Sequence, residues 1–226
     1  MFSIVGGTYL ESCIDPDYYE LYGSGLRAAI ALSNKGLNIN FHSIIGNDHV
    51  EVLKSISTLY NINTKMIIAD QTVEFEYYHP LSKPNPISTD NTIKEINTVN
   101  DTKVLYYGLL EGNAKFSAEY VVYDPQNHKS FKETGATAKH LALILNKKEA
   151  YKISSLYNTD LISVGKSLLI TENADVIVIK NGSEGALVFD NNGVYPIPIF
   201  ETASVWPIGS GDIFSAVFAM GANPSE

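Results

Sequence analysis

A glycine-rich turn near the C-terminus has the clearest chemical meaning in the sequence. Gly209, Ser210, Gly211 and Asp212 begin an apolar stretch in which a helix is expected over 211–220. Glycines at a helix start let a ligand approach the backbone, and the free N–H groups of the first turn favour an anion. A carboxylate beside such an anion can take the proton of an attacking hydroxyl. The same residues also fit a plain glycine turn in which Asp212 caps the helix.

Several other segments combine with this turn into a longer pattern. They lie at 5–7, 29–36, 122–126, 146–149, 176–186 and 193–196. Their order, with a strand ending in a Lys-Asn-Gly turn before a Gly-x-Gly-Asp signature, resembles the ribokinase family, the PfkB carbohydrate kinases. Asn-x-x-Glu at 146–149 and Asp-Pro at 124–125 are similar to two further motifs of that family. The resemblance spans nearly the whole chain and implies phosphoryl transfer from ATP to an alcohol.

The resemblance implies a catalytic role for the glycine-rich turn. Asp212 would be the general base that takes the proton of the acceptor hydroxyl. The backbone N–H groups of Gly209, Ser210, Gly211 and Asp212 would stabilise the charge on the phosphoryl oxygens.

Two further motifs are implied to hold the cofactors, ATP and Mg²⁺. Asn146 and Glu149 would bind Mg²⁺ and phosphate through water, because Mg²⁺ keeps much of its hydration. Lys180 and Gly182 would lie beside the nucleotide phosphates. The simpler interpretations are a helix N-cap with a first-turn carboxylate, a lysine at a strand end and a turn glycine.

The residues implied to bind the acceptor depart from the family pattern. Where the family places an Asp that hydrogen-bonds sugar hydroxyls, this chain has Glu11, and Gly23 and Arg27 replace part of a Gly-Gly and Asn motif. Before the glycine-rich turn, 206–208 reads Trp-Pro-Ile instead of a polar triplet, so a monovalent-cation site there is doubtful. The chain between Glu11 and Gly23 looks too short for lid strands, so only 65–79 is expected to supply a lid.

Arg27 is the only arginine in the chain and lies in an apolar helical segment. A guanidinium in such a segment needs a partner or a route to water. One interpretation is a structural salt bridge to Glu11. The other is a fork that binds an anionic group of the substrate.

The elements that must position these residues alternate between short apolar strands and helical patterns, which favours a largely parallel sheet covered by helices. Strands are expected at 3–5, 39–45, 104–107, 120–123, 141–145 and 176–179, with a hairpin over 186–189 and 194–199. Helices are expected at 26–35, 49–60, 147–157, 161–171 and 211–220. In the helix at 49–60, Val52, Leu53, Ile56 and Leu59 form the expected apolar stripe. Residues 66–68 and 73–78 look like an antiparallel pair, and the proline-rich stretch 80–101 looks like a loop.

The amino-acid composition argues against some classes of binding partner. A formal net charge of −9 makes nucleic acid and anionic membrane surfaces poor partners. Cys13 is the only cysteine, so no internal disulfide can form. No signal peptide or membrane-length apolar run is found, and a cytoplasmic location is expected.

We therefore expect one domain over 1–226, a three-layer α/β/α sandwich of ribokinase type with a mostly parallel central sheet and a reduced β lid. The expected activity is ATP- and Mg²⁺-dependent phosphorylation of a small metabolite, most simply a sugar, nucleoside or similar polyol. The alternative is a binding or regulatory protein that keeps the fold without turnover.

Members of the resembled family continue past the last helix, so part of the fold is expected to be missing here. Residues 223–226 look like the start of a further helix, and ATP is expected to bind weakly, its phosphates better than its base. The apolar flank at 214–220 would favour a homo-oligomer.

Overall fold

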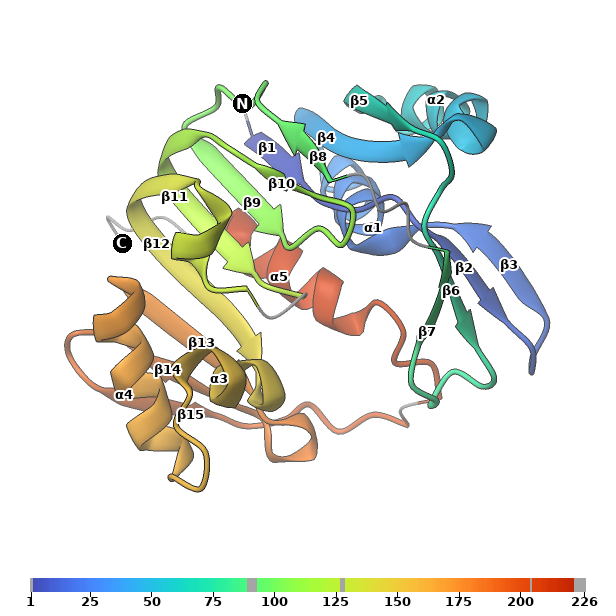
Figure 1. The fold of residues 1–226 in the computed structure, drawn as a ribbon. Helices are drawn as coiled ribbons and strands as arrows, with labels where there is room; N and C mark the ends of the chain where they lie inside the picture. The colour runs from blue at the N-terminus through green and yellow to red at the C-terminus, as the bar shows by residue number, and fades with distance from the viewer. Residues whose placement is uncertain (1, 89–92, 127–128, 204, 222–226) are drawn as a thin grey trace.

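The apolar strands assemble into one large sheet. The computed structural model describes residues 2–88, 93–126, 129–203 and 205–221. Nine strands pair in the order β15-β14-β13-β12-β11-β9-β1-β4-β5 (Figure 1). All neighbours from β5 to β13 are parallel, while β14 pairs antiparallel with both β13 and β15. The strands are β1 Phe2–Val5, β4 Ile39–Gly46, β5 Asn63–Ala69, β9 Lys103–Tyr107, β11 Ser117–Asp124, β12 Thr137–Asn146, β13 Val176–Lys180, β14 Ala186–Phe189 and β15 Val194–Ile197.

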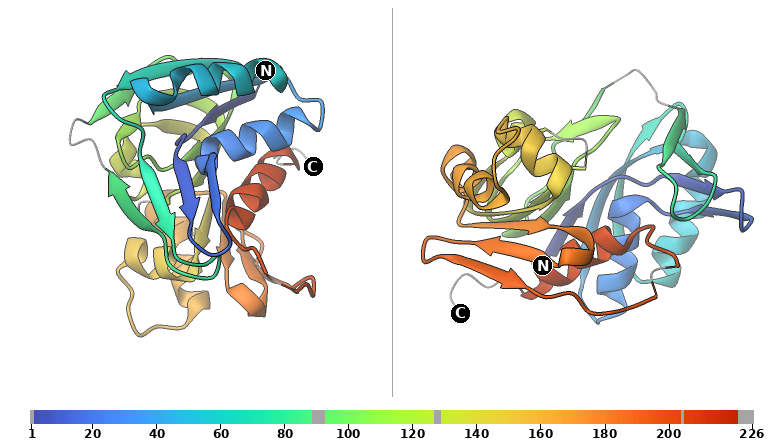
Figure 2. Two further views of the ribbon diagram at one scale, coloured as in Figure 1. Left: turned by 90° about the vertical axis from the view of Figure 1, so that its right-hand side faces the viewer. Right: turned by 90° about the horizontal axis from the view of Figure 1, so that it is seen from below.

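Helices cover both faces of this sheet, because its strands carry apolar side chains on both faces. Helices α1 Gly23–Ser33, α2 Val50–Leu59 and α5 Ser210–Gly221 pack on one face, and α3 Lys147–Ser154 and α4 Leu161–Glu172 on the other. Successive strand residues alternate between the two cores, so Ile4 packs with α1 while Val5 lies in the opposite core. Figure 2 shows α1 and α5 side by side. The predicted three-layer arrangement is confirmed.

A second sheet of four strands, in the order β3-β2-β6-β7, forms the lid beside the central sheet (Figure 1). Its strands are β2 Leu10–Cys13, β3 Tyr18–Leu21, β6 Glu74–Tyr77 and β7 Asn85–Ser88. The expectation that the chain between Glu11 and Gly23 is too short for lid strands was wrong. Two strands of four residues and a four-residue turn fit there, since a hairpin needs only a short loop.

The predicted pairing of 66–68 with 73–78 was also wrong. Residues 66–68 belong to β5, which pairs in parallel with β4 in the central sheet. Strand β6 pairs instead with β2 and β7. The local apolar pattern is compatible with both the predicted and the observed strand pairing. Only contacts between residues distant in sequence distinguish the two.

The stretch 80–101 contains more regular structure than the expected loop. It holds β7 and β8 Lys94–Ile96, and β8 pairs in parallel with β10 Gly112–Ala114. Pro86 fits in β7 because β7 is an edge strand of the lid, where a missing N–H does not break the sheet.

The predicted helices are present with shifted ends. Helix α1 starts at Gly23, three residues before the expected start, and α3 ends at Ser154. In α2 the predicted stripe is wrong at Val52 and Leu59, which are exposed, while Leu53 is buried. Because α2 covers the edge of the sheet near β5, only a narrow stripe of it faces the core.

Three observations bear on the remaining expectations. None of the helices in the described part of the chain has the length and hydropathy of a membrane span. The flank of α5 exposes Phe214, Val217 and Met220 at 40, 50 and 42%. The helix start expected at 223–226 lies outside the described residues.

The topology sets where a ligand can bind. The chain proceeds outward from β1 in one direction through β4 and β5, and in the other through β9, β11, β12 and β13. In such sheets ligands bind at the carboxyl ends of the strands, near the point where the order reverses. Tyr107, Asp124, Asn146 and Lys180 are the last residues of β9, β11, β12 and β13.

Candidate active site

The first turn of α5 provides the expected anion-binding backbone. Gly209 has a φ of +78°, and a Cβ there would lie 2.2 Å from Nε of Arg27, so a side chain would be both strained and crowded. The N–H of Ser210 donates to the carbonyl of Pro207 at 3.0 Å. The N–H of Ser210 is therefore not available to a phosphoryl oxygen, contrary to its expected role. The N–H groups of Gly211 and Asp212 lie in the first turn, where helix geometry offers no intrahelical acceptor.

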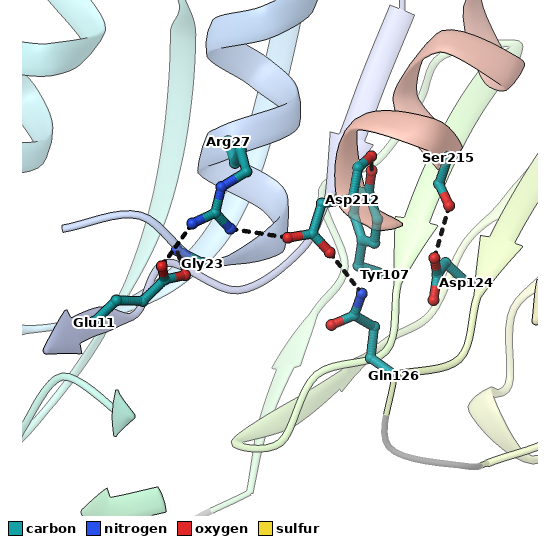
Figure 3. A network of polar contacts seen from close by, with 8 residues as sticks. All are labelled: Glu11, Gly23, Arg27, Tyr107, Asp124, Gln126, Asp212 and Ser215. Atoms are coloured by element: carbon teal, nitrogen blue, oxygen red, sulfur yellow. Dashed lines mark hydrogen bonds and ion pairs between the residues drawn. The ribbon is translucent and has the colours of Figure 1, made fainter. Parts of the chain in front are cut away.

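Asp212 is held from three sides (Figure 3). Its Oδ2 accepts from Arg27 at 2.9 Å and its Oδ1 accepts from Gln126 at 2.9 Å. Its main-chain oxygen accepts from the Tyr107 hydroxyl at 2.6 Å. Burial raises the pKa of the Asp212 carboxyl, although Arg27 and Gln126 oppose the shift. A carboxylate that is fixed in place and has a raised pKa has the properties of a general base.

Arg27 joins two carboxylates. Its second terminal nitrogen donates to Glu11 at 2.6 Å, and the other oxygen of Glu11 accepts from the N–H of Gly23 at 3.0 Å. The guanidinium also lies over the ring of Tyr22, 5.1 Å from its centroid. The predicted salt bridge to Glu11 is therefore confirmed. In the other interpretation the guanidinium binds an anionic group of the substrate. In the structure its two terminal nitrogens already contact Glu11 and Asp212.

A cavity of about 320 Å³ opens beside these residues, and we call it the acceptor cavity. Five predicted residues line it: Glu11, Gly23, Arg27, Gly209 and Asp212. The other lining residues are Tyr9, Ser24, Phe75, Tyr77, Pro84, Pro86, Gly108, Leu110, Gln126 and Ile208. Phe75 and Tyr77 of β6 both line it, because residues two apart on a strand face the same side of the sheet.

A second cluster lies on the other side of the α5 start. Lys180 donates to Asp124 at 3.2 Å, and Ser215 donates to the same oxygen at 2.6 Å. A Cβ on Gly211 would lie 3.4 Å from Nζ of Lys180, so the ammonium is adjacent to the free N–H groups. This positive charge would favour an anion at the first turn of α5. Gly182 begins an exposed 3₁₀ turn with a φ of +60°, and its contact with phosphate stays a prediction.

Asn146 and Glu149 form a capping box at the start of α3. The Asn146 side chain accepts from the N–H of Glu149 at 3.0 Å, and Glu149 accepts from the N–H of Asn146 at 2.7 Å. The simpler interpretation of the motif is therefore present in the structure. Burial, and then the charge of Asp124, raise the pKa of Glu149 to about 7. A nearby cation would relieve this unfavourable proximity of two carboxylates.

The donor set fits a hydrated magnesium ion. Among the described residues, no three His, Cys, Asp or Glu side chains are grouped to hold a metal directly. Mg²⁺ commonly keeps several waters and uses one or two carboxylates together with substrate phosphates. Glu149, with the neighbouring Asp124 and the amide of Asn146, supplies oxygen ligands of that kind.

Three residues of the site have no role in the sequence-based prediction. Asp124 is the last residue of β11 and Gln126 follows it by two positions, in the Asp-Pro segment that carried the resemblance. Tyr107 is the last residue of a predicted strand. Their position at strand ends was a usable signal, because carboxyl ends of parallel strands share one edge of the sheet.

Comparison with known proteins agrees with this geometry. Residues 31–223 match the model of the pfkB family of carbohydrate kinases. A search of curated protein sequences found no match.

Solved structures with the same fold are similar over nearly the whole chain. One is a pyrophosphate-dependent kinase of the ribokinase family, in complex with a pyrophosphate analogue and myo-inositol, with 15% identity and a TM-score of 0.72 over 98% of this chain and 86% of that one. Ribokinase from Thermotoga maritima has 17% identity and a TM-score of 0.71 over 100% and 88%. The nucleoside kinase of Methanocaldococcus jannaschii has 15% identity and a TM-score of 0.65 over 99% and 86%. The predicted ribokinase-type fold is confirmed.

Proposed function

Because the chain belongs to the pfkB family of carbohydrate kinases, we propose that it transfers the γ-phosphoryl group of ATP to an alcohol bound in the acceptor cavity. One observation carries the proposal. Asp212 lines the acceptor cavity and stands in the first turn of α5, next to the ammonium of Lys180. A base for the acceptor hydroxyl and a site for the transferred phosphoryl group therefore lie side by side.

The proposed reaction is a direct displacement. The Asp212 carboxylate takes the proton of the acceptor hydroxyl while that oxygen forms a bond to the γ-phosphorus. The bond from the γ-phosphorus to the bridging oxygen breaks, and ADP leaves with its electron pair. Arg27 and Gln126 keep the carboxylate oriented, and each of its oxygens retains a lone pair that can receive the proton.

The chain's own groups stabilise the transferred charge. The N–H groups of Gly211 and Asp212 and the ammonium of Lys180 would contact the phosphoryl oxygens. Mg²⁺, held through water by Glu149 and Asn146, would neutralise part of the phosphate charge.

Pyrophosphate is the second candidate donor. The groups identified on the donor side, at the start of α5 and at Lys180, all recognise phosphate rather than a base. A structurally similar protein is described as pyrophosphate-dependent. ATP and pyrophosphate share the group that these residues would bind, so both belong in the same test.

A ligand-binding protein without turnover is the candidate of another class. It is favoured by the contacts of both Asp212 oxygens with Arg27 and Gln126, and by the capping box that engages Asn146 and Glu149.

The deciding experiment combines ATP, GTP and pyrophosphate, each with Mg²⁺, and a panel of sugars, nucleosides and other small alcohols. Phosphorylated product is detected by mass spectrometry, with calorimetry on the same pairs. Product from any pair that disappears in Asp212→Asn supports the kinase. Binding without product for every pair would support the binding protein.

A further inference from the structure

The three residues before the glycine-rich turn depart from the family pattern, and the proposed function gives them no role. They are Trp206, Pro207 and Ile208. The preceding residues, 198–203, are exposed and form no helix or strand. Trp206 follows this exposed segment, yet only 38% of its surface is exposed, so much of its ring is covered by another part of the protein.

The partner of Trp206 belongs to the lid. The indole ring meets the ring of Tyr18 edge to face, with centroids 5.2 Å apart and ring planes inclined by 65°. Tyr18 is the first residue of β3, and Figure 1 shows the segment before α5 reaching the lid. Aromatic pairs of this kind are favourable by roughly 2- to 10-fold in an equilibrium constant, beyond the area that they bury. The contact therefore joins β3 to the segment that leads into α5.

Tyr18 lies on the face of the lid that is turned to the acceptor cavity. It shares this face with Glu20, two residues along β3, and Glu20 is paired with Glu11 of β2. Burial, and then the charge of Glu11, raise the pKa of the Tyr18 hydroxyl, which agrees with the proximity of that carboxylate. Glu11 itself lines the cavity. Trp206 therefore holds the side of the lid that an acceptor would contact.

The chain between Trp206 and the glycine-rich turn is stiff. The ring of Pro207 fixes its own φ and disfavours helical backbone at Trp206. The carbonyl of Pro207 accepts from the N–H of Ser210 at 3.0 Å, which closes a tight turn. Ile208 and Gly209 lie inside that turn and line the acceptor cavity. A displacement of Trp206 is therefore passed on to the start of α5 and not absorbed by the residues between them.

The lid is thus joined to the proposed base by two routes. From β2, Glu11 contacts Arg27, which contacts Asp212. From β3, Tyr18 contacts Trp206, which leads through the stiff turn to the start of α5. The first route is ionic and belongs to the lining of the acceptor cavity. The second consists of two rings beside the cavity, so it can be changed without removing a cavity residue.

We infer that Trp206 is a positioning residue, which ties the lid to the glycine-rich turn through Tyr18 and so sets how firmly the acceptor is held. The catalytic consequence rests on the proposed function, whereas the coupling between lid and turn does not. Loss of the contact should loosen the cavity wall carried by the lid and weaken acceptor binding. It should affect the chemical step less, because Asp212 keeps its contacts with Arg27 and Gln126.

Hydrogen exchange in the protein without ligands tests the coupling directly. Tyr18→Leu should speed exchange of the backbone N–H groups at 205–213 about 2- to 10-fold, although the substituted residue lies in the lid. Trp206→Leu should speed exchange at 10–21 by a similar factor. Faster exchange that stays confined to the substituted element in both variants would overturn the inference.

Tyr19→Leu is the matched control, because Tyr19 is 62% exposed and points to the opposite face of the lid from Tyr18. It should leave exchange at 205–213 unchanged. The double variant Tyr18→Leu/Trp206→Leu should exchange no faster than the more affected single variant, since both substitutions remove one contact. An equal effect of Tyr19→Leu, or additive effects in the double variant, would reject the specific contact.

Fluorescence reports on the contact itself, because Trp206 is the only tryptophan in the chain. Tyr18→Leu should expose the indole and increase its quenching by acrylamide, whereas Tyr19→Leu should not. Equal quenching in Tyr18→Leu and the unchanged protein would show that the ring of Tyr18 does not cover Trp206.

Kinetics measures the catalytic consequence, with the donor and acceptor pair that gives most product in the panel described above. Trp206→Leu should raise the acceptor KM by up to about 10-fold and change kcat by less than about 3-fold. Trp206→Phe keeps a ring and should restore most of the affinity. An unchanged KM in Trp206→Leu would overturn the role in acceptor binding. If no pair gives product, the kinase proposal fails, and hydrogen exchange still decides whether Trp206 couples the lid to the turn.

Discussion

Arg27 and Asp212, which are 185 positions apart in sequence, form a hydrogen bond of 2.9 Å in the lining of the acceptor cavity. The same guanidinium contacts Glu11 at 2.6 Å, so one arginine fixes both an acceptor-side carboxylate and the proposed base. The base is therefore positioned by the residue that holds the lid strand β2 to helix α1. The attachment of β2 to α1 and the orientation of Asp212 therefore depend on one side chain.

Arg27→Met should affect both stability and pH dependence. It leaves two carboxylates without their cation, and the free energy of unfolding should fall by about 3–5 kcal/mol. Because Arg27 lowers the pKa of Asp212, its loss should raise that pKa further. A higher pKa keeps the base protonated to higher pH, so the acidic limb of the pH–rate profile should move upward.

Denaturant unfolding and pH–rate profiles check this prediction. Arg27→Lys is the control, since it keeps the charge but not the fork. The double variant Glu11→Gln/Arg27→Met should be non-additive in stability, as expected for residues in contact. Additive effects together with an unmoved acidic limb would reject the shared role.

Asp212→Asn should fold normally and lose phosphoryl transfer by about 100-fold or more, the usual scale for a positioned general base. The amide can still accept from Arg27, so the loss should appear in kcat rather than in stability. Asp70→Asn is the control, because Asp70 is exposed and outside the cavity. Activity of Asp212→Asn within a few-fold of the unchanged protein would exclude it as the base.

Glu149→Gln separates capping from magnesium binding. Glutamine keeps an acceptor for the N–H of Asn146 but removes the charge, so the magnesium requirement should rise more than stability falls. Glu133→Gln is a close control, because Glu133 closes a similar capping box with Ser130 at a distant 3₁₀ turn. A magnesium titration that overlays the unchanged protein, with a lower melting temperature, would show that Glu149 is only a cap.

Glu111→Gln should change how stability depends on pH. Burial raises the pKa of Glu111 from 4.5 to about 7, so between these values the folded state holds more protons than the unfolded state. The contribution of Glu111 to stability therefore falls as pH rises from about 4.5 to about 7, by at most about 3 kcal/mol. Above pH 7 it should be constant.

Chemical unfolding at pH 5 and at pH 8 measures this contribution. Glutamine still accepts from Tyr9 and has no charge to bury, so the variant should lose less stability than the unchanged protein over this range. A larger loss in the variant would mean that Glu111 is ionised without penalty.

Much of the fold could be predicted because it depends on local patterns. Runs such as 176–179 are apolar on both faces, which indicates a buried parallel strand wherever its neighbours lie. The lid could not be predicted in the same way. Residues 66–68 and 73–78 both suit a strand, and the choice of partner among β2, β4 and β7 depends on pairing across distant positions.

The same distinction between local and non-local features applies to the candidate active site. The sequence alone determined the glycine-rich turn with Asp212, the cap at Asn146 and Glu149, and the ends of the parallel strands, because each is a feature of a few consecutive residues. Only the tertiary structure decided that Arg27 pairs with Asp212 and that the N–H of Ser210 donates to Pro207. It also decided that the rings of Phe75 and Tyr77 line the cavity. These depend on strand register and side-chain direction, and a one-residue slip in register would turn every lid side chain to the opposite face.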